Sequence, residues 1–259
     1  MNDIEPKEDL WGYRKRLRFV CDATAAAFPN RAVSDIRILD VGCGSATQLG
    51  LPLAESGYQL TGIDTHEDSI DVAQDLAKDF PNAKFVCGRV ENLNAELFDV
   101  IILSEVLEHV SAPQQLLTAS LRHMKNDGLV IVTVPNGYGE FEWDSWLFRS
   151  LRFDLLVQKY EMRQAIQTGK RRIIASTENH ENGHIQFFTR SRIHKLFSSC
   201  GLTILNANSS TLASGPFAGH TLARFPAFIE WNARITDKLP MAFASGWFFA
   251  LRRNPGGSE

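Results

Sequence analysis

Short apolar runs alternate with amphipathic stretches over residues 36–134 of the chain. Several of these runs carry valine and isoleucine at neighbouring positions, as expected of strands buried on both faces of a sheet. Strands that alternate with helical stretches in this way predict a parallel sheet covered by helices. The five predicted strands are Ile36–Val41, Gln59–Ile63, Lys84–Cys87, Phe98–Leu103 and Leu129–Val134.

Two of the intervening stretches have the apolar spacing of a helix. The first follows Asp64, and the pair Pro81-Asn82 is expected to end it. The second precedes a turn signal at residues 126–128, Asn-Asp-Gly. The first apolar stripe consists of Ile70, Ala73, Ala77 and Phe80, and the second of Leu117, Leu121 and Met124.

The same alternation resumes at Thr189, a plausible N-cap for a helix that Gly201 would end. Its apolar face would comprise Ile193, Leu196, Phe197 and Cys200. Two more apolar runs, Leu202–Ala207 and Trp247–Leu251, predict a sixth and a seventh strand.

The regular pattern fails in two segments, residues 137–183 and 208–243, which are rich in aromatic residues. We interpret both as insertions into a single domain that spans residues 1–259, with a helix in the first at about residues 144–166. The aromatic side chains could pack locally in the core, or they could form a lid over an apolar substrate pocket.

Composition and charge narrow the classes of partner. The net charge of -3 and the isoelectric point near 6.2 count against nucleic acid. The four cysteines are scattered without a C-x-x-C pair, which favours a reducing, cytoplasmic compartment. The first residues are too charged for a signal peptide, and no run approaches the roughly 20 apolar residues of a spanning helix.

The motif most indicative of chemistry is Ile38-Leu39-Asp40-Val41-Gly42-Cys43-Gly44, an apolar strand that ends in an acidic residue and a Gly-x-Gly turn. Glycines allow the backbone to turn sharply and to approach a ligand closely. The turn lacks the third glycine of a dinucleotide fingerprint and has no basic residue, so a ligand without phosphates fits better. Asp64 ends the next strand, where a carboxylate can accept hydrogen bonds from both hydroxyls of a ribose.

Four successive motifs, ILDVGCG, TGID, FDVIILSEVLEHV and LVIVTVPN, resemble those of class I S-adenosylmethionine-dependent methyltransferases. The resemblance is closest to the small-molecule O-methyltransferase-like branch of the ubiquinone-biosynthesis type, which the segment GHIQFFTRSRIHKLFSSCGL also resembles. It implies a Rossmann-like α/β fold, with a seven-stranded, mostly parallel sheet, an antiparallel last strand and helices on both faces. S-adenosyl-L-methionine is the implied cofactor.

The resemblance also implies a role for each motif position. Gly42, Cys43 and Gly44 would pass under the methionine part of the cofactor, with Asp40 near its amino group. Asp64 and Thr65 would lie at the ribose, Val90 and Glu91 at the adenine, and Ser104 and Glu105 beside the sulfonium. Simpler interpretations stay open: Asp64 as a helix cap, Cys43 as a space-filling residue, and Glu105 and Glu108 as charges at a helix N-terminus.

A hydroxyl acceptor would be helped by a general base, for which histidine is the usual residue. His184 and His109 are the candidates, although His109 could instead pack or hydrogen-bond at a helix end. His180 to His184 match the zinc-protease pattern H-E-x-x-H, but that pattern requires both histidines on one helix. The Asn-Gly pair between them is a strong turn signal, so we expect no metal.

The sequence therefore predicts a methyltransferase that acts on an oxygen of a small molecule, a saccharide or a lipid-linked intermediate. The alternative is a catalytically silent relative that binds the cofactor in a structural or regulatory role. The missing third glycine weakens a further alternative, a nicotinamide oxidoreductase. A membrane surface carrying the acceptor could be contacted by Phe217, Phe225, Phe228 and Trp231. Nothing in the sequence indicates an oligomeric state.

Overall fold

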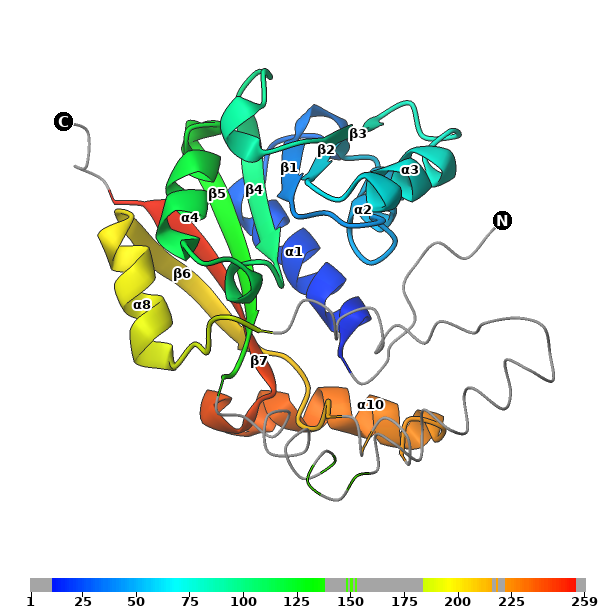
Figure 1. Cartoon of the computed structure of the whole chain (residues 1–259), viewed down its shortest axis with the longest axis vertical. Helices are drawn as coiled ribbons and strands as arrows, with labels where there is room; N and C mark the ends of the chain where they lie inside the picture. Colours follow the sequence, from blue (N-terminus) through cyan, green and yellow to red (C-terminus); the bar gives the residue numbers. More distant parts are fainter. Residues whose placement is uncertain are drawn as a thin grey trace.

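The computed structural model describes residues 11–137, 184–215 and 222–254, together with residues 148, 150, 152 and 218. Seven strands form one sheet in the order β3-β2-β1-β4-β5-β7-β6 (Figure 1). All neighbouring pairs are parallel except those of β7, which runs antiparallel to both β5 and β6. The predicted mostly parallel sheet with an antiparallel last strand is thus confirmed. The strands are β1 (Arg37–Val41), β2 (Gln59–Asp64), β3 (Ala83–Cys87), β4 (Phe98–Ser104), β5 (Met124–Pro135), β6 (Leu202–Ser209) and β7 (Gly246–Arg253).

Side chains alternate between two hydrophobic cores, one on each face of the sheet. On β1, Ile38 belongs to one core and Leu39 to the other, and both are fully buried. The central strand β4 is buried along nearly its whole length. This burial on both faces explains why its sequence is a continuous apolar run.

Helices cover both faces (Figure 1). On one face lie α1 (Tyr13–Ala27), α2 (Gly50–Glu55) and α3 (Glu67–Leu76), which contribute Val20, Leu53 and Ile70 to the core. On the other face lie α4 (Pro113–Leu121) and α8 (Arg190–Ser199), which contribute Leu117 and Phe197. The predicted caps of α8 are confirmed: the Thr189 side chain accepts a hydrogen bond from the Arg192 amide, and Gly201 has a φ of 68°.

Two predicted boundaries are wrong. Helix α3 ends at Leu76, before the expected stop at Pro81, because the Phe80 amide closes a tight turn onto the Ala77 carbonyl. Residues 126–128 form no turn before β5. They lie within that strand, where the pairing register with β4 shifts. Met124 consequently begins β5 and does not belong to the preceding helix.

The segment 208–243 contains more regular structure than its sequence suggests. Helix α10 (Pro226–Ile235) is followed by the 3-10 turns η4 (Thr236–Lys238) and η5 (Met241–Phe243). Lys15 of α1 anchors this segment, donating to the carbonyls of Ser210 and Ala233 at 3.1 and 2.9 Å and pairing with Asp237 at 2.6 Å. Figure 1 shows α10 beyond the end of β5, on the side of the sheet where the carboxyl ends of the parallel strands lie.

The predicted helix at residues 144–166, His180, Phe217 and the C-terminal tail lie outside the described residues. Within the described part of the chain, none of the helices is long and apolar enough to cross a membrane.

Candidate functional site

The turn after β1 brings the backbone to the carboxyl edge of the sheet. Gly42 and Gly44 have φ angles of 75° and 51°, which glycine adopts without strain. A Cβ atom on Gly42 would lie 2.5 Å from Cγ2 of Val106, whereas a Cβ atom on Gly44 would meet nothing within 4 Å. The turn is therefore packed on one side and open on the other, so a ligand can approach its backbone closely.

Asp64, at the end of β2, is fixed by two backbone amides. Its Oδ2 accepts a hydrogen bond from the Gly44 amide, and its Oδ1 accepts one from the His66 amide, both at 2.9 Å. The first bond joins the glycine turn to the end of β2. Each carboxylate oxygen can accept a further hydrogen bond, so Asp64 is placed to bind a pair of hydroxyl groups.

Asp40 is buried beneath the same turn, with 3% of its surface exposed. Burial, and to a lesser degree the nearby carboxylate of Asp64, raises the pKa of Asp40 to about 7, while Arg16 acts in the opposite direction. A buried carboxyl at this position would be stabilised in its charged form by an ammonium group of a ligand.

Arg16 of α1 also reaches this part of the molecule, although it is not among the site residues expected from the sequence. It is 5% exposed, and its Nη2 lies 3.4 Å from Oε1 of Glu105. Its guanidinium lies over the rings of Tyr13 and Phe248. The sequence signal that could have identified Arg16 as buried is its helical spacing, because Arg16 shares the apolar face of α1 with Val20 and Ala23.

The end of β4 presents a hydroxyl and a carboxylate. Ser104 Oγ lies 3.0 Å from Thr133 Oγ1, which in turn donates to Oε1 of Glu105 at 2.7 Å. Glu105 has a φ of 54°, an uncommon value for a residue other than glycine. Such strain often accompanies functional positions, and here it turns the chain towards the 3-10 turn η3 (Leu107–His109).

Val90 and Glu91 lie in the 3-10 turn η2 (Val90–Asn92) after β3. His123 Nε2 lies 2.9 Å from the Val90 carbonyl and holds this turn against the end of α4. A hydrogen bond from the backbone amide of Glu91, followed by Arg89, lowers the pKa of the Glu91 carboxyl. Glu91 is exposed and could accept a hydrogen bond from a ligand.

The other two expected residues are Cys43 and Thr65. Burial raises the pKa of the Cys43 thiol, and the Asp40 and Asp64 carboxylates add to this effect, so the thiol stays protonated near neutral pH. The Thr65 carbonyl lies 3.8 Å from Cys87 Sγ.

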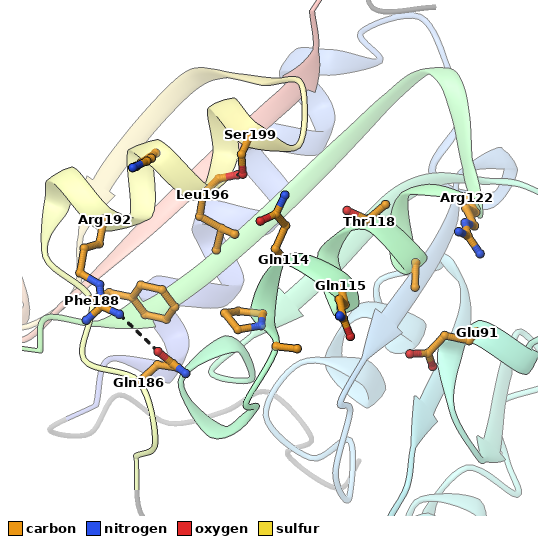
Figure 2. A pocket seen from close by; sticks show the side chains of 14 residues that line it. Glu91, Gln114, Gln115, Thr118, Arg122, Gln186, Phe188, Arg192, Leu196 and Ser199 are labelled. Carbon is orange, nitrogen blue, oxygen red and sulfur yellow. Dashed lines mark hydrogen bonds between the residues drawn. The ribbon is translucent and has the colours of Figure 1, made fainter. Parts of the chain in front are cut away.

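A groove of about 1030 Å³ runs between α4 and α8 (Figure 2). Glu91 and Arg122 lie at one end of it, and Gln186 and Arg192 at the other. The residues of the glycine turn do not line this groove. Of the expected cofactor contacts, Glu91 alone lines the groove, whereas those at the ends of β1 and β2 lie outside it.

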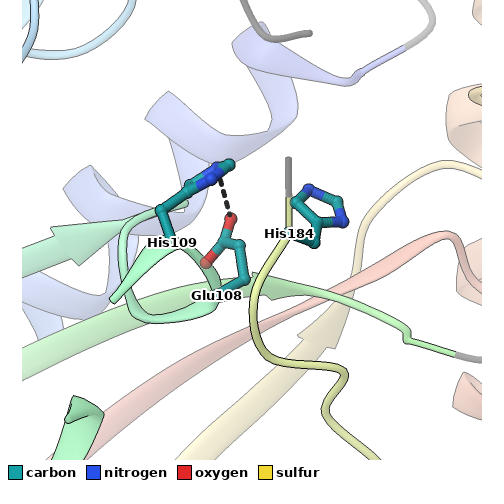
Figure 3. A group of neighbouring side chains, drawn as sticks. All are labelled: Glu108, His109 and His184. Carbon is teal, nitrogen blue, oxygen red and sulfur yellow. Dashed lines mark ion pairs between the residues drawn. The ribbon is translucent and has the colours of Figure 1, made fainter. Parts of the chain in front are cut away.

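Glu108, His109 and His184 form a cluster that we call the acceptor cluster (Figure 3). Their ligand-type atoms lie within 4.8 Å of one another, and the two imidazole rings are 5.1 Å apart. Glu108 is fully buried, and no donor among the described residues hydrogen-bonds to either of its carboxylate oxygens. Burial and, secondly, Glu105 raise the pKa of Glu108 well above its usual range.

The structure separates the two acidic residues Glu105 and Glu108. Neither lies in the first turn of α4, which begins at Pro113, but Glu108 lies in the first turn of the 3-10 helix η3. His109 Nε2 lies 3.7 Å from Oε1 of Glu108.

The acceptor cluster also bears on the expectation that no metal is bound. His184 lies within 4.8 Å of His109 and Glu108, whereas His180, its partner in the zinc-protease pattern, lies outside the described residues. A buried carboxylate and two imidazoles are a set of groups that divalent transition metals accept. The cluster could thus hold a cation, or it could bind and deprotonate a hydroxyl group.

Similarity to known proteins extends over most of the chain. The family model described as a methyltransferase domain matches residues 10–207. A ubiquinone biosynthesis O-methyltransferase of Rickettsia akari is 36% identical over 124 residues, which are 47% of this chain and 48% of that protein. The mitochondrial enzyme of the same name from Rattus norvegicus is 35% identical over 115 residues, 42% of this chain and 33% of that protein. The chain spans about half the length, or less, of the curated relatives it matches.

Solved structures support the fold. Magnesium protoporphyrin IX methyltransferase from Synechocystis, solved with bound SAH, matches with a TM-score of 0.55 at 14% identity, over 94% of this chain and 85% of that one. An S-adenosylmethionine-dependent methyltransferase from Clostridium acetobutylicum matches with a TM-score of 0.57 at 11% identity, over 93% and 92%.

Proposed function

The chain belongs to the methyltransferase-domain family, and on this premise we propose that it binds S-adenosyl-L-methionine and transfers the methyl group to an oxygen of a small molecule. The observation that carries the proposal is the hydrogen bond between the glycine turn after β1 and the end of β2, which the Gly44 amide donates to the Asp64 carboxylate at 2.9 Å. That geometry offers an open glycine backbone, a paired acceptor for ribose and a buried carboxyl at Asp40 in one place.

The residues present fit this cofactor. Gly42 and Gly44 would let its methionine part lie against the backbone, and Asp40 would bind its ammonium group. Asp64, with Thr65 beside it, would accept the ribose hydroxyls, and Val90 and Glu91 would flank the adenine. When bound, the sulfonium supplies an electrophilic methyl group; the protein mainly has to align the acceptor with it.

The acceptor would lie between Ser104-Glu105 and the acceptor cluster. We propose that His184, with His109 beside it, takes the proton of the acceptor hydroxyl as the hydroxyl oxygen bonds to the methyl carbon. The bond between that carbon and the sulfonium sulfur would break in the same step, and the cofactor would leave as a neutral thioether. A second role is favoured by the proximity of Glu108: the cluster could hold a divalent cation that binds the acceptor oxygen and stabilises its ionised form.

The acceptor class is a small molecule, which includes a saccharide or a lipid-linked intermediate. Segment 208–243 would cover it as a lid, and the exposed Phe225 and Trp231 would provide any contact with a membrane surface. The other part of the predicted lid, segment 137–183, lies almost entirely outside the described residues. We propose a cytoplasmic location and no nucleic-acid partner, consistent with the net charge of -3.

The proposal is tested by incubating the protein with cofactor labelled in the methyl group and a panel of phenols, saccharides and polyprenyl-linked alcohols. We expect label to appear in at least one oxygen-methylated product. A protein that binds the cofactor tightly and labels no member of the panel would favour the catalytically silent alternative. Adding a chelator to the active protein then separates the two roles of the acceptor cluster. If the cluster acts as a base, the chelator should lower the rate of methylation less than about twofold. If the cluster holds a cation that turnover needs, the chelator should abolish methylation.

A further inference from the structure

The segment that carries His184 has no regular secondary structure between residues 184 and 189. Its burial is also uneven, because Ile185 and Phe187 are 59% and 39% exposed while Phe188 is buried. Neither helix or strand hydrogen bonds nor continuous apolar packing can therefore fix the position of the His184 imidazole. Contacts with neighbouring elements have to do so.

One such contact comes from η3. The amides of Ile185 and Gln186, which directly follow His184, both donate to the carbonyl of Glu108, at 2.8 and 2.9 Å. These two bonds bring the segment against the acceptor cluster. Farther along the segment, the Gly137 amide donates to the Phe188 carbonyl at 3.0 Å.

Arg192, in the first turn of α8, also bonds to the segment. Its Nη1 donates to the Phe187 carbonyl at 2.8 Å. Its Nη2 donates to Oε1 of Gln186 at 3.4 Å, the bond drawn in Figure 2. The Gln186 side chain reaches on to the Ser111 carbonyl at 3.5 Å. The guanidinium is thus the link between helix α8 and the residues beside His184.

We propose that Arg192 is a positioning residue for methyl transfer: through Phe187 and Gln186 it holds the His184 imidazole beside Glu108 and His109. This inference rests on the proposed function, because the position of His184 affects turnover only if the acceptor reacts next to it. Arg192 lines the groove between α4 and α8 at the end away from Glu91, which is the one proposed cofactor contact among the lining residues (Figure 2). Its loss should leave cofactor binding intact.

The chemistry of the side chain predicts a graded effect. An arginine presents two donors in a planar fork and can reach both acceptors at once, whereas a lysine offers a single charged group. Arg192→Ala removes both bonds, and Arg192→Lys can keep one of them. Gln186→Leu removes only the side-chain acceptor. Arg190→Ala is the matched control, because Arg190 is an exposed cation in the same helical turn.

The experiment measures kcat, KM for the acceptor and Kd for SAH in these four variants and in the parent. We expect kcat to fall about tenfold or more in Arg192→Ala, less in Arg192→Lys and Gln186→Leu, and less than about twofold in Arg190→Ala. The Kd for SAH should change less than about twofold in all of them. A kcat in Arg192→Ala within about twofold of the parent, or an equal loss in Arg190→Ala, would overturn the inference.

A second measurement does not depend on turnover. In protein labelled with ¹⁵N-histidine, the imidazole signals of His184, assigned with His184→Gln, should move in Arg192→Ala and in Gln186→Leu but not in Arg190→Ala. Unmoved signals in the first two variants would contradict the positioning role. If the parent binds SAH but methylates nothing, the proposed function fails, and this spectrum still decides whether Arg192 positions His184. Should Arg192→Ala not fold, Gln186→Leu provides both readouts.

Discussion

Asp64 makes the most testable contribution of any single side chain, because both of its oxygens are already oriented by backbone amides. Asp64→Ala should lower the affinity for SAH at least about tenfold, since a hydrogen bond to a charged group contributes about 1.5–3 kcal/mol. Calorimetry measures this loss. Asp68→Ala, an exposed acidic residue of α3, is the control, and unchanged affinity in Asp64→Ala would contradict its assignment to the ribose.

Asp40 should make cofactor binding depend on pH. With a pKa of about 7, this carboxyl is partly protonated in the free protein at neutral pH, and an ammonium group favours its ionised form. Affinity for SAH should therefore rise from about pH 6 to about pH 8 and then level off. Asp40→Asn should bind more weakly, with a flatter profile over the same range.

The same carboxyl affects stability with the opposite sign. Because the folded chain holds this proton more tightly than the unfolded chain does, the contribution of Asp40 to the free energy of unfolding falls as pH rises from about 4 to about 7. Urea unfolding of the parent and of Asp40→Asn without ligand would show the difference between them across that range. A profile for Asp40→Asn that parallels the parent would show that another group is responsible.

His184 tests the chemical step. If it takes the proton of the acceptor, His184→Ala and His184→Gln should both lower kcat by about 10²–10⁴, with the melting temperature and the Kd for SAH unchanged. A turnover number within about threefold of the parent in both variants would remove His184 from the mechanism. The reaction would then depend on alignment, as an already ionised oxygen would allow.

Some site residues follow directly from sequence and others do not. Gly42, Gly44 and Asp64 stand at strand ends, and the ends of adjacent parallel strands meet at one edge, so their proximity is predictable. Arg16 comes near Asp40 and Glu105, and Glu108 comes near Glu105, only through packing of α1 and η3. No short-range spacing encodes such contacts.

Among the elements, α8 provides a direct test of helix capping. Thr189→Ala removes the acceptor for the Arg192 amide and should lower the free energy of unfolding by about 1 kcal/mol. Chemical denaturation measures the change. Ser198→Ala, an exposed position in the same helix, should alter stability by less than about 0.5 kcal/mol. Equal losses in both variants would show that the cap contributes nothing particular.

Element boundaries were less predictable than element types for identifiable reasons. The caps of α8 are single residues with strong local preferences, Thr189 and Gly201, and both are confirmed. The end of α3 instead depends on a tight turn at residues 77–80, and the start of β5 on pairing with β4 across a register shift. Tertiary pairing overrode the turn preference of Asn126-Asp127-Gly128.

At the scale of the whole molecule, Lys15 connects the first helix with the segment that contains α10. Its buried ammonium bonds to two carbonyls and pairs with Asp237, so Lys15→Met should lower the free energy of unfolding by about 1–3 kcal/mol. Amide exchange in α10 should accelerate as well. Lys238→Met, an exposed residue of the same segment, serves as the control, and equal exchange in both variants would contradict the anchoring role.

The parallel part of the sheet was predictable because each strand is a separate apolar run and parallel strands need helical crossovers, whereas the antiparallel last strand was expected from the family resemblance. The groove between α4 and α8 was not, because it depends on how two distant helices pack. The helix in segment 208–243 was also missed, because its buried positions include the polar Asn232 while the aromatic Trp231 is half-exposed, so apolar residues do not mark its buried face.

The position of β7 has a consequence for how the protein is made. This strand is inserted between β5 and β6, so β6 has no partner in the sheet until residues 246–253 have been synthesised. During translation the chain would carry a five-stranded sheet with an open edge at β5 and a loose strand beside it, both prone to unwanted pairing. A ribosome-bound chain ending at residue 245 should therefore be cleaved by protease within 202–209 while β1 to β5 resist. Equal resistance of the two regions would show that β6 packs against the rest of the chain before β7 has been synthesised.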